Sequence, residues 1–481
     1  MKIKNGLLSF LPATIALIIV LSHSGCANIV PPSGGPRDTL PPVLMSALPD
    51  NVSYHFKANK IVLTFDEFID AKDLSTNLFV NPVPKIAPIV DAKLRTLTIR
   101  IKDTLQPNTT YSLDFGKAIR DVNEANILRN FTYLFSTGSY IDSMEFTGNV
   151  ILAATGKIDT GMIVLLHRKL DDSAVVKDRP RYVVRVDSTG YFHFRYIEPG
   201  TYALYAMKDE GGTRKYLSKG QLFAFAEAPV VISGRNTKPV TLYAYSEKLE
   251  TKTKSTTGNK PANAKPSAKE RLKEKDKRLQ FTTNIANNVF DVLDTLHLTF
   301  PNGLRVFDSS KVSFVDENFH DIAPKDYHFL PDSTHKIFWL FYSWPTDTKF
   351  HLIFAKDFAL DSAGRKLLKI DTITFHTKRD IDYGEVRIRI TNLNLNKNPV
   401  LQFIQQDAVK FSYPFGKVRQ FKVQLFPPGD YELRILYDDN RNGIWDAGEF
   451  FGKHLQPEKI VPIRKKFTVK ANWDNDLDIT L

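Results

Sequence analysis

Short runs of alternating apolar and polar residues dominate the chain after about residue 43. KIVLTFDEF (60–68), TLTIRI (96–101) and TYSLDFG (110–116) are rich in β-branched and aromatic residues, and polar turn strings such as DTLQPNTT separate them. A period of two is typical of strands with one buried face. No segment of ten or more residues in these regions has helical periodicity. The pattern predicts an all-β protein of two-sheet sandwiches.

The strand pattern occurs twice along the chain. FSTGSYIDSMEFTGNV returns as FHTKRDIDYGEVRIRI, and IEPGTYALYAMKD returns as FPPGDYELRILYD, in the same order. The matched positions are Thr137 with Thr377, Asp142 with Asp382, Glu145 with Glu385, Gly200 with Gly429, Tyr202 with Tyr431, Leu204 with Leu433, and Asp209 with Asp438. Two anchors that recur in one order indicate a duplicated unit of two modules.

A chain of 481 residues is too long for one hydrophobic core, so about three to four domains are expected. The duplication divides the chain into pairs of modules on either side of a lysine-rich tract, and we expect a hinge there. The predicted segments are 1–25 (signal peptide), 26–42 (Pro/Gly tether), 43–138 (first sandwich), 139–247 (second sandwich), 248–280 (linker), 281–378 (degenerate copy of the first sandwich) and 379–481 (copy of the second).

The amino terminus is predicted to be an export signal. Lys2 and Lys4 give it a positive start, and the apolar run 7–21 is shorter than a membrane-crossing helix requires. Cys26, the only cysteine in the chain, follows two small residues. This ending resembles a bacterial lipobox, whose cysteine thiol receives a diacylglyceryl group, although His23 stands where an aliphatic residue is usual. The alternative is an ordinary signal peptide with an incidental cysteine.

A lipidated Cys26 would hold the protein on a membrane, because several acyl chains at one terminus anchor stably. The resemblance implies a lipoprotein of the cell envelope at the outer membrane, facing either the periplasm or the outside. A protein exported to an oxidising compartment with a single cysteine must be stable without internal disulfides.

The net charge of +12 is concentrated outside the predicted sandwiches. Residues 248–280 carry a net charge of +7, in a Pro-, Thr- and Lys-rich tract without apolar periodicity. A nucleic-acid protein would place its basic residues on a folded face among aromatics, so no nucleic-acid partner is expected. The tract is interpreted as a solvated linker, with contact to anionic envelope polymers or lipid headgroups as the alternative.

Two family resemblances follow from these strings. FDEFIDAKDL, NTTYSLDFGKAIRDVNEANILRNFTYLFSTG and PPSGGPRD resemble the bacterial Ig-like domain of the SbsA type, and more closely an uncharacterised group of Ig-like lipoproteins of Bacteroidota. The order D-x-x-G-Y-F-x-F, then x-P-G-x-Y-x-L, is similar to transthyretin-like or carboxypeptidase-regulatory-like sandwiches. The resemblances imply a layout of Ig-like, transthyretin-like, linker, Ig-like and transthyretin-like modules.

One metal-binding motif lies in the last module. DDNRNGIWDAGE, residues 438–449, satisfies D-x-[DN]-x-[DN]-G-x5-E, a spacing of oxygen donors that suits calcium. One calcium ion is expected, in a loop that follows a strand. The predicted ligands are Asp438, Asn440, Asn442, the Ile444 carbonyl, Asp446 and Glu449.

The alternative is a polar turn in which Asp and Asn side chains bond the backbone without an ion. The duplicate is an internal comparison. In its equivalent stretch, DEGGTRKYLSKG, Gly211, Thr213 and Gly220 replace the ligands Asn440, Asn442 and Glu449, and Arg214 replaces the turn glycine Gly443, so this copy is not expected to bind calcium. In the last module the protein's oxygen donors would fill the coordination shell of the ion. The ion would therefore stiffen the fold rather than take part in a reaction.

Two acidic strings and one aromatic strand have the residue types that carbohydrate chemistry uses. DEFIDAKD (66–73) and DVNEAN (121–126) contain carboxylates that could act as an acid–base pair, but both lie at strand ends, where turns favour such residues. The aromatic strand that contains Phe338, Trp339, Phe341, Tyr342 and Trp344 could stack on sugars, but core packing is the preferred interpretation. Histidines are scattered without zinc spacing, and no nucleophile motif is present.

The sequence therefore predicts a non-enzymatic envelope lipoprotein that holds, spaces or binds a protein or glycan partner. A carbohydrate-binding or polysaccharide-processing accessory protein is the first alternative. An assembly subunit that docks through exposed edge strands is the second.

Overall fold

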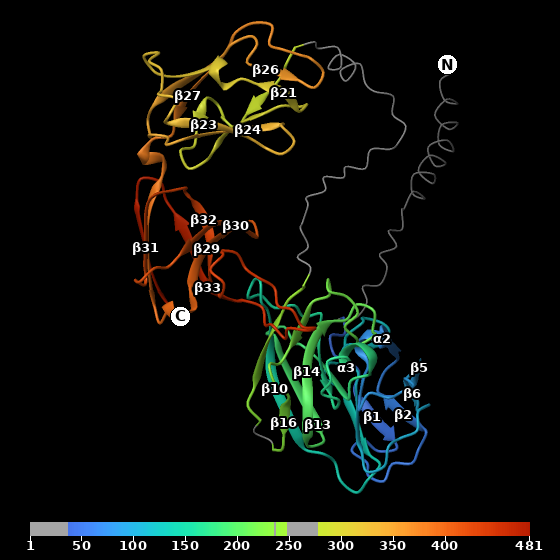
Figure 1. Ribbon diagram of the computed structural model, residues 1–481. Helices are drawn as coiled ribbons and strands as arrows, with labels where there is room; N and C mark the ends of the chain where they lie inside the picture. The colour runs from blue at the N-terminus through green and yellow to red at the C-terminus, as the bar shows by residue number, and fades with distance from the viewer. Residues whose placement is uncertain (1–36, 235–236, 248–277) are drawn as a thin grey trace, which may run out of the picture. The chain divides into compact units, whose positions relative to one another are not determined.

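A computed structural model describes residues 37–234, 237–247 and 278–481 (Figure 1). Contacts between Cα atoms divide the chain into two compact units. The first comprises the residues up to Met144 together with Arg181–Val183 and Arg195–Glu198, and the second comprises the rest. Almost every regular element is a strand, so the predicted all-β fold of tandem sandwich modules is confirmed.

The first module contains two sheets and a strand pair, all antiparallel. One sheet has the order β1-β2-β6-β5 and the other the order β4-β7-β9, while β3 pairs with β8. One helical turn, α2 (Leu74–Asn77), precedes β4. The strands are β1 (Leu44–Leu48), β2 (Lys60–Phe65), β3 (Ile69–Ala71), β4 (Phe79–Asn81), β5 (Ile89–Lys93), β6 (Thr96–Arg100), β7 (Thr110–Asp114), β8 (Ile119–Asp121) and β9 (Thr132–Ser136).

The second module also has two sheets. One has the order β13-β10-β17, and the other has the order β12-β11-β14-β15 with β16 on β14; α3 (Ala174–Lys177) is a single helical turn. The strands are β10 (Met144–Leu152), β11 (Met162–His167), β12 (Tyr182–Arg185), β13 (Tyr191–Ile197), β14 (Gly200–Lys208), β15 (Phe223–Phe225), β16 (Val230–Ile232) and β17 (Val240–Ala244).

The third module has sheets of order β18-β20-β24-β23 and β19-β27-β25-β22, and β21 pairs with β26. The elements are β18 (Thr282–Thr283), β19 (Val289–Phe290), β20 (Leu296–Thr299), β21 (Leu304–Phe307), η1 (Ser309–Lys311), β22 (Val312–Asp316), β23 (Tyr327–Pro331), β24 (Ile337–Tyr342), β25 (Lys349–Phe354), β26 (Ala359–Asp361) and β27 (Asp371–Thr377).

The fourth module has sheets of order β31-β28-β34 and β30-β29-β32-β33. The elements are η2 (Asp380–Asp382), β28 (Gly384–Thr391), η3 (Leu395–Lys397), β29 (Pro399–Gln405), β30 (Ala408–Pro414), β31 (Gln420–Phe426), β32 (Gly429–Tyr437), β33 (Lys459–Val469) and β34 (Asp474–Thr480).

The strand order repeats between the two halves, as the sequence anchors predicted. The sheet β13-β10-β17 of the second module corresponds to β31-β28-β34 of the fourth, and in both the first strand of the module pairs in parallel with the last. The sheet β1-β2-β6-β5 of the first module likewise corresponds to β18-β20-β24-β23 of the third. The third module therefore keeps the topology of the first although their sequences have diverged.

The threonine anchor makes the same hydrogen bonds in both copies. Thr137 Oγ1 accepts the backbone N–H of Thr109, and Thr377 Oγ1 accepts that of Thr348, each at 2.9 Å. Each hydroxyl also donates to a backbone carbonyl at 2.7 Å. A threonine is retained here because its side chain closes the same loop in each copy.

Buried aspartates close a second repeated turn. Asp121 at the end of β8 accepts the backbone N–H groups of Glu124, Ala125 and Asn126 at 2.6–2.8 Å. In the third module Asp361, at the end of β26, accepts the N–H groups of two following residues. Burial alone would raise the pKa of Asp121, but these donors outweigh it and hold the pKa below its ordinary value.

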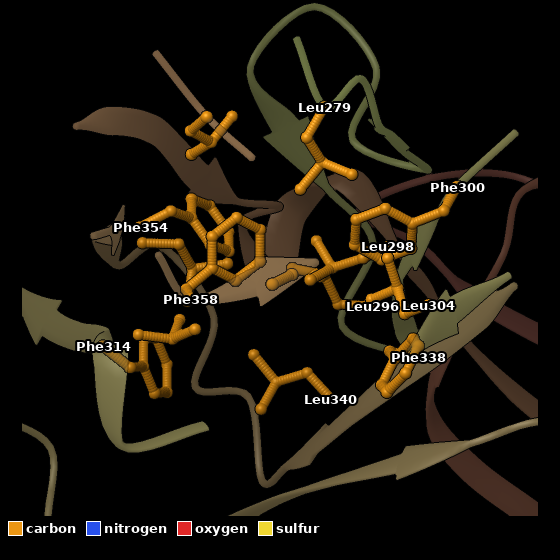
Figure 2. Packing of buried hydrophobic residues seen from close by; sticks show 14 of the residues in the cluster. Leu279, Leu296, Leu298, Phe300, Leu304, Phe314, Phe338, Leu340, Phe354 and Phe358 are labelled. Carbon is orange, nitrogen blue, oxygen red and sulfur yellow. The ribbon is translucent and has the colours of Figure 1, made fainter. Parts of the chain in front are cut away.

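Aromatic and leucine side chains fill the core of the third module (Figure 2). Leu296 and Leu298 of β20 lie beside Leu340 and Phe338 of β24, the adjacent strand of the same sheet. Phe354 of β25, in the other sheet, belongs to the same core. Alternate residues of β24 are buried, because side chains of a strand alternate between its two faces.

Replacing Phe354 by alanine should lower the free energy of unfolding by about 3–5 kcal/mol, because this fully buried ring would leave a cavity. Denaturant unfolding followed by tryptophan fluorescence measures the change. Phe341→Ala removes a partly exposed ring from the same module and should cost less than about 1 kcal/mol. Equal losses for both variants would contradict this assignment of the core.

Replacing Asp121 by alanine should destabilise the first module by about 1–3 kcal/mol, because three backbone donors lose their acceptor. Because the folded-state pKa is lowered, the contribution of Asp121 is present above about pH 4 and is lost as the pH falls through its folded pKa. Thermal unfolding between pH 7 and pH 3 should therefore show a difference between parent and variant that shrinks with acid. Glu124→Ala keeps the backbone donor and is the control.

Candidate functional site

The loop between β32 and β33 contains the predicted calcium motif. It begins at Asp438, which is almost fully buried and accepts the backbone N–H groups of Asn442 and Gly443 at 3.2 and 2.7 Å. Gly443 has a φ of 80°, which favours glycine at this point of the turn. A carboxylate has about four lone-pair positions, so Asp438 keeps acceptor capacity beyond these two bonds.

The equivalent loop of the second module begins with the same turn. Asp209 accepts the N–H groups of Thr213 and Arg214 at 3.0 and 2.9 Å. This aspartate turn therefore forms in a copy that lacks the calcium motif. Burial lowers the pKa of Arg214, while the nearby Asp209 carboxylate raises it. A partly buried guanidinium thus lies near the aspartate in the copy that was not expected to bind an ion.

Three further predicted ligands converge in the last module. The side-chain amides of Asn440 and Asn442 each donate to the same oxygen of Asp446 at 2.6 Å. Their carbonyl oxygens accept the N–H groups of Asn442 and Ile444 two residues ahead. These bonds correspond to the polar turn that was left as the alternative: the amide N–H groups of both asparagines point to Asp446, and their oxygens accept backbone N–H groups.

The predicted closing ligand lies elsewhere. The Glu449 carboxylate forms an ion pair with Lys453 at 2.7 Å, and its backbone pairs with Leu455. The carboxylate at the loop is Glu458, whose two oxygens accept the N–H groups of Asp439 and Asp446 at 2.8 and 3.0 Å. Glu458 was missed because it stands twenty residues after Asp438, beyond the reach of the twelve-residue motif.

The site is rich in buried negative charge. Burial raises the pKa of Glu458, and the carboxylates of Asp438 and Asp446 raise it further, against the lowering effect of its two backbone donors. Over the described residues, no group of three or more His, Cys, Asp or Glu side chains is arranged to hold a metal by itself. A cation would therefore also need the oxygens of asparagine amides and of the backbone.

Trp445 anchors the loop to the sheet beneath it. Its indole N–H donates to the Glu458 carbonyl at 2.8 Å, and its ring packs on Val400, Leu436 and Ile460. These three residues form a cluster separate from the main core of the module. The loop therefore covers part of a second apolar face of its own sheet.

Residues 447–457 continue this loop away from the fourth module, and we call them the tongue. Phe450, at its tip, is fully buried. The ring centroid of Phe450 lies 5.0 Å from that of Phe223, 4.9 Å from that of Phe225 and 5.7 Å from that of Tyr205, all in the second module. The tongue thus inserts an aromatic side chain between strands more than two hundred residues earlier in the sequence.

We call the receiving residues the socket: Tyr205, Phe223, Phe225, Tyr245 and Glu247. The Glu247 carboxylate accepts the backbone N–H of Phe450 at 3.4 Å and the Tyr216 hydroxyl at 3.2 Å, and it pairs with Lys219 at 2.8 Å. Its side chain is only 6% exposed. Its proximity contributes to the raised pKa values of Tyr216 and Tyr245, for which burial is the larger cause.

Polar contacts surround the aromatic contact. His454 of the tongue lies 2.5 Å from an Asp172 oxygen, and the Gln456 amide donates to the Phe225 carbonyl at 3.0 Å. Gly448 fits against the socket so closely that a Cβ there would lie 2.8 Å from the Tyr245 ring and 2.5 Å from the Leu455 carbonyl oxygen.

Further contacts join the bodies of the same two modules. Arg434 of β32 donates to the Ala154 carbonyl at 2.8 Å, and Lys157 pairs with Asp407 at 2.8 Å. The expectation that a hinge at the lysine-rich tract separates the two pairs of modules is therefore wrong for the second and fourth modules. It failed because strand periodicity reports which side chains are covered, but not which distant segment covers them.

A sequence signal for this contact exists. All six residues of β11 are buried, and so are six consecutive residues of β14. MIVLLH and YALYAM are continuous runs, which are typical of strands covered on both faces. The corresponding strand β32 alternates more strongly. The two continuous apolar runs therefore indicate that the outer face of this sheet is covered, but they do not indicate which segment covers it.

Aspartates of the two acidic strings in the first module form hydrogen bonds and ion pairs within loops and turns. Asp66 accepts the N–H of Val43 at 2.8 Å, Asp70 pairs with Lys72, and Asp121 closes the turn after β8. Burial raises the pKa of Glu67, with smaller effects of Asp121 and other nearby carboxylates. The bonds of Asp66 and Asp121 agree with the structural interpretation of these strings.

The aromatic strand of the third module packs mainly inward. Phe338 belongs to the core, and Tyr342 and Trp344 pack against it. Trp339 is partly buried, and Phe341 is 38% exposed and stacks on His328 at 5.0 Å. The packing interpretation therefore holds for most of this group.

Cys26 and most of the lysine-rich tract lie outside the described residues, so their predicted roles stay predictions. Within the described residues, no helix is long and apolar enough to cross a membrane.

Comparison with known proteins supports the assignment of the first module. Residues 38–137 match the family model of a bacterial Ig-like domain. No curated protein matches the chain significantly.

Among solved structures, the chain is similar to BcpA, the major pilin subunit of Bacillus cereus, with 11% identity over 70% of this chain and 99% of that one, and a TM-score of 0.16. It is also similar to an Escherichia coli alpha-2-macroglobulin fragment spanning domains MG0-NIE-MG1, with 12% identity over 41% and 79% and a TM-score of 0.19. The N-terminal part of the bacterial S-layer protein SbsC matches with 16% identity over 43% and 44% and a TM-score of 0.16. Similarity this weak carries no argument about function.

Proposed function

We propose that this protein is a non-enzymatic scaffold of the cell envelope, whose β-sandwich modules hold or space a protein or glycan partner at the outer membrane. The observation that carries this proposal is the tongue. The aromatic outer face of the second module, which could have received a ligand, is filled by Phe450 of the same chain. Surface that an enzyme would leave open for substrate is used here to join modules.

The carbohydrate-processing alternative has less support. It requires a pair of free carboxylates beside exposed aromatic rings. Asp66 and Asp121 instead accept backbone N–H groups, and the rings of the candidate aromatic strand are mostly covered. A glycan remains a candidate partner for binding, without a catalytic role.

The anchor in this proposal is a lipidated Cys26. Its support is the sequence: a positive start, an apolar run too short to span a membrane, and a lone cysteine after small residues. The Ig-like match immediately downstream is compatible with membership of the SbsA-type Ig-like lipoproteins of Bacteroidota.

We also propose one calcium ion in the fourth module. Its ligands would be Asp438, Asn440, Asn442, the Ile444 carbonyl and Asp446, with Glu458 in place of Glu449. The support is the spacing of the oxygen-bearing side chains in the loop, the position of Asp446 within hydrogen-bond distance of both asparagines, and the burial of Glu458 near Asp438 and Asp446. The bound ion would offset repulsion between these carboxylates, and the chain would gain a rigid loop rather than a reaction centre.

Cys26→Ser should release the protein from membranes, because the acyl chains have no other attachment point in the chain. Expression of parent and variant, followed by membrane fractionation and immunoblotting, measures the change. Retention of the variant on washed membranes would remove the lipoprotein proposal. Substitution of His23 by leucine, which restores the usual lipobox residue, should leave the parent's membrane retention intact.

Calorimetric titration of the soluble chain with calcium should give one site. Asp438→Ala should abolish the heat, and Glu458→Gln should weaken binding by about tenfold or more, because each removes a charged ligand. Glu449→Gln is the matched control and should bind like the parent, because its carboxylate pairs with Lys453. If the parent gives no heat, the loop is a polar turn that binds no calcium. If calcium binding is lost in Glu449→Gln and kept in Glu458→Gln, Glu449 is the closing ligand, as the twelve-residue motif predicts.

A further inference from the structure

The tongue and the socket have the composition of a specific binding pair. The tongue contributes a fully buried phenylalanine, and the socket contributes the aromatic rings of Tyr205, Phe223 and Phe225 around it. A buried aromatic anchor in a preformed pocket, with polar contacts at the rim, is the arrangement that dominates the energy of protein interfaces. His454 with Asp172 and Gln456 with the Phe225 carbonyl supply that rim.

The pairing is directional, because each partner occurs on one copy only. The position of Tyr205 on β14 is occupied by Arg434 on β32, so the fourth module lacks this part of the socket. The loop of the second module that corresponds to the tongue instead contributes Tyr216 and Lys219 around Glu247. The interface therefore joins a donor copy to a receiver copy and leaves no second socket on the fourth module to extend a chain of molecules.

The covalent connection between the two partners is long. The socket ends at Glu247, and thirty residues, 248–277, separate it from Arg278, where the described chain resumes. Thirty extended residues reach at most about 100 Å, so this connection alone sets a wide limit on the separation of the two halves. The noncovalent contact is what holds the tongue in the socket.

We infer that the tongue–socket contact is a self-sufficient clasp, which holds the third and fourth modules onto the second within one molecule even when the connecting segment is cut. The partner of the socket is the tongue of the same chain. The clasp does not depend on the calcium proposal, because its contacts come from residues 447–457 and not from the candidate ion ligands.

The test places a specific protease site in the segment 248–277 of the otherwise intact soluble chain. After complete cleavage at micromolar concentration, the two fragments should elute together in size-exclusion chromatography, with the light-scattering mass of one chain. Phe450→Ala should weaken their association by about 100-fold or more, since truncating a buried phenylalanine costs about 3–5 kcal/mol. The fragments of this variant should then elute separately.

Phe451→Ala is the matched control: this neighbouring ring is 38% exposed and touches the second module only at the rim, where it stacks on Tyr216 at 6.0 Å, so its removal should change the association by less than about tenfold. Circular dichroism and thermal unfolding of the separated fragments establish that Phe450→Ala still folds. Asp172→Asn, on the socket side, should weaken the pair without changing either the tongue or its module. Separation of the parent fragments on cleavage would overturn the clasp, and a dimeric mass for the uncleaved chain that Phe450→Ala converts to monomer would show that the tongue is exchanged between copies.

Discussion

The outer face of the β11–β14 sheet is the constraint on which the arrangement of the second unit depends. A sandwich buries one face of each sheet in its own core, and the other face normally meets water. In the second module that other face is aromatic, and a surface of this kind is not stable in water unless something covers it. The tongue, which belongs to the loop between β32 and β33, covers it with the buried ring of Phe450.

The second and fourth modules show how one duplicated scaffold acquires complementary roles. Both begin the loop with an aspartate that binds two backbone N–H groups, so the turn itself belongs to the fold. Beyond the turn, one copy places the partly buried guanidinium of Arg214 near its aspartate, whereas in the other the asparagine amides donate to Asp446. The shared acid is balanced by a built-in cation in one copy and by neutral donors in the other.

Much of the fold was predictable, because alternation, turn residues and the repeated anchors are local signals. The recurring bonds of Thr137 and Thr377 explain why the threonines could be aligned from sequence alone. Asp121 and Asp361 were harder to interpret, since a carboxylate at a strand end has the same sequence signature whether it caps a turn or faces a ligand.

The candidate site was predicted only in part, because some of its residues are close in the sequence and others are far apart. Asn440, Asn442 and Asp446 lie within a few residues of one another, so their convergence follows from local geometry. Glu458 reaches the loop only because the chain leaves along the tongue and returns, and no fixed spacing encodes such an excursion. The socket likewise required knowledge of which distant loop meets which sheet.

Gly448 shows that a mutation can affect the contact between two modules separately from their folding. Any side chain at this position would collide with the Tyr245 ring and with the backbone of the tongue itself. The glycine lies in the tongue and in neither sandwich core, so a substitution there acts on the contact between the second and fourth modules rather than on the packing inside either one. The strength of that contact and the stability of each sandwich are therefore set by different residues.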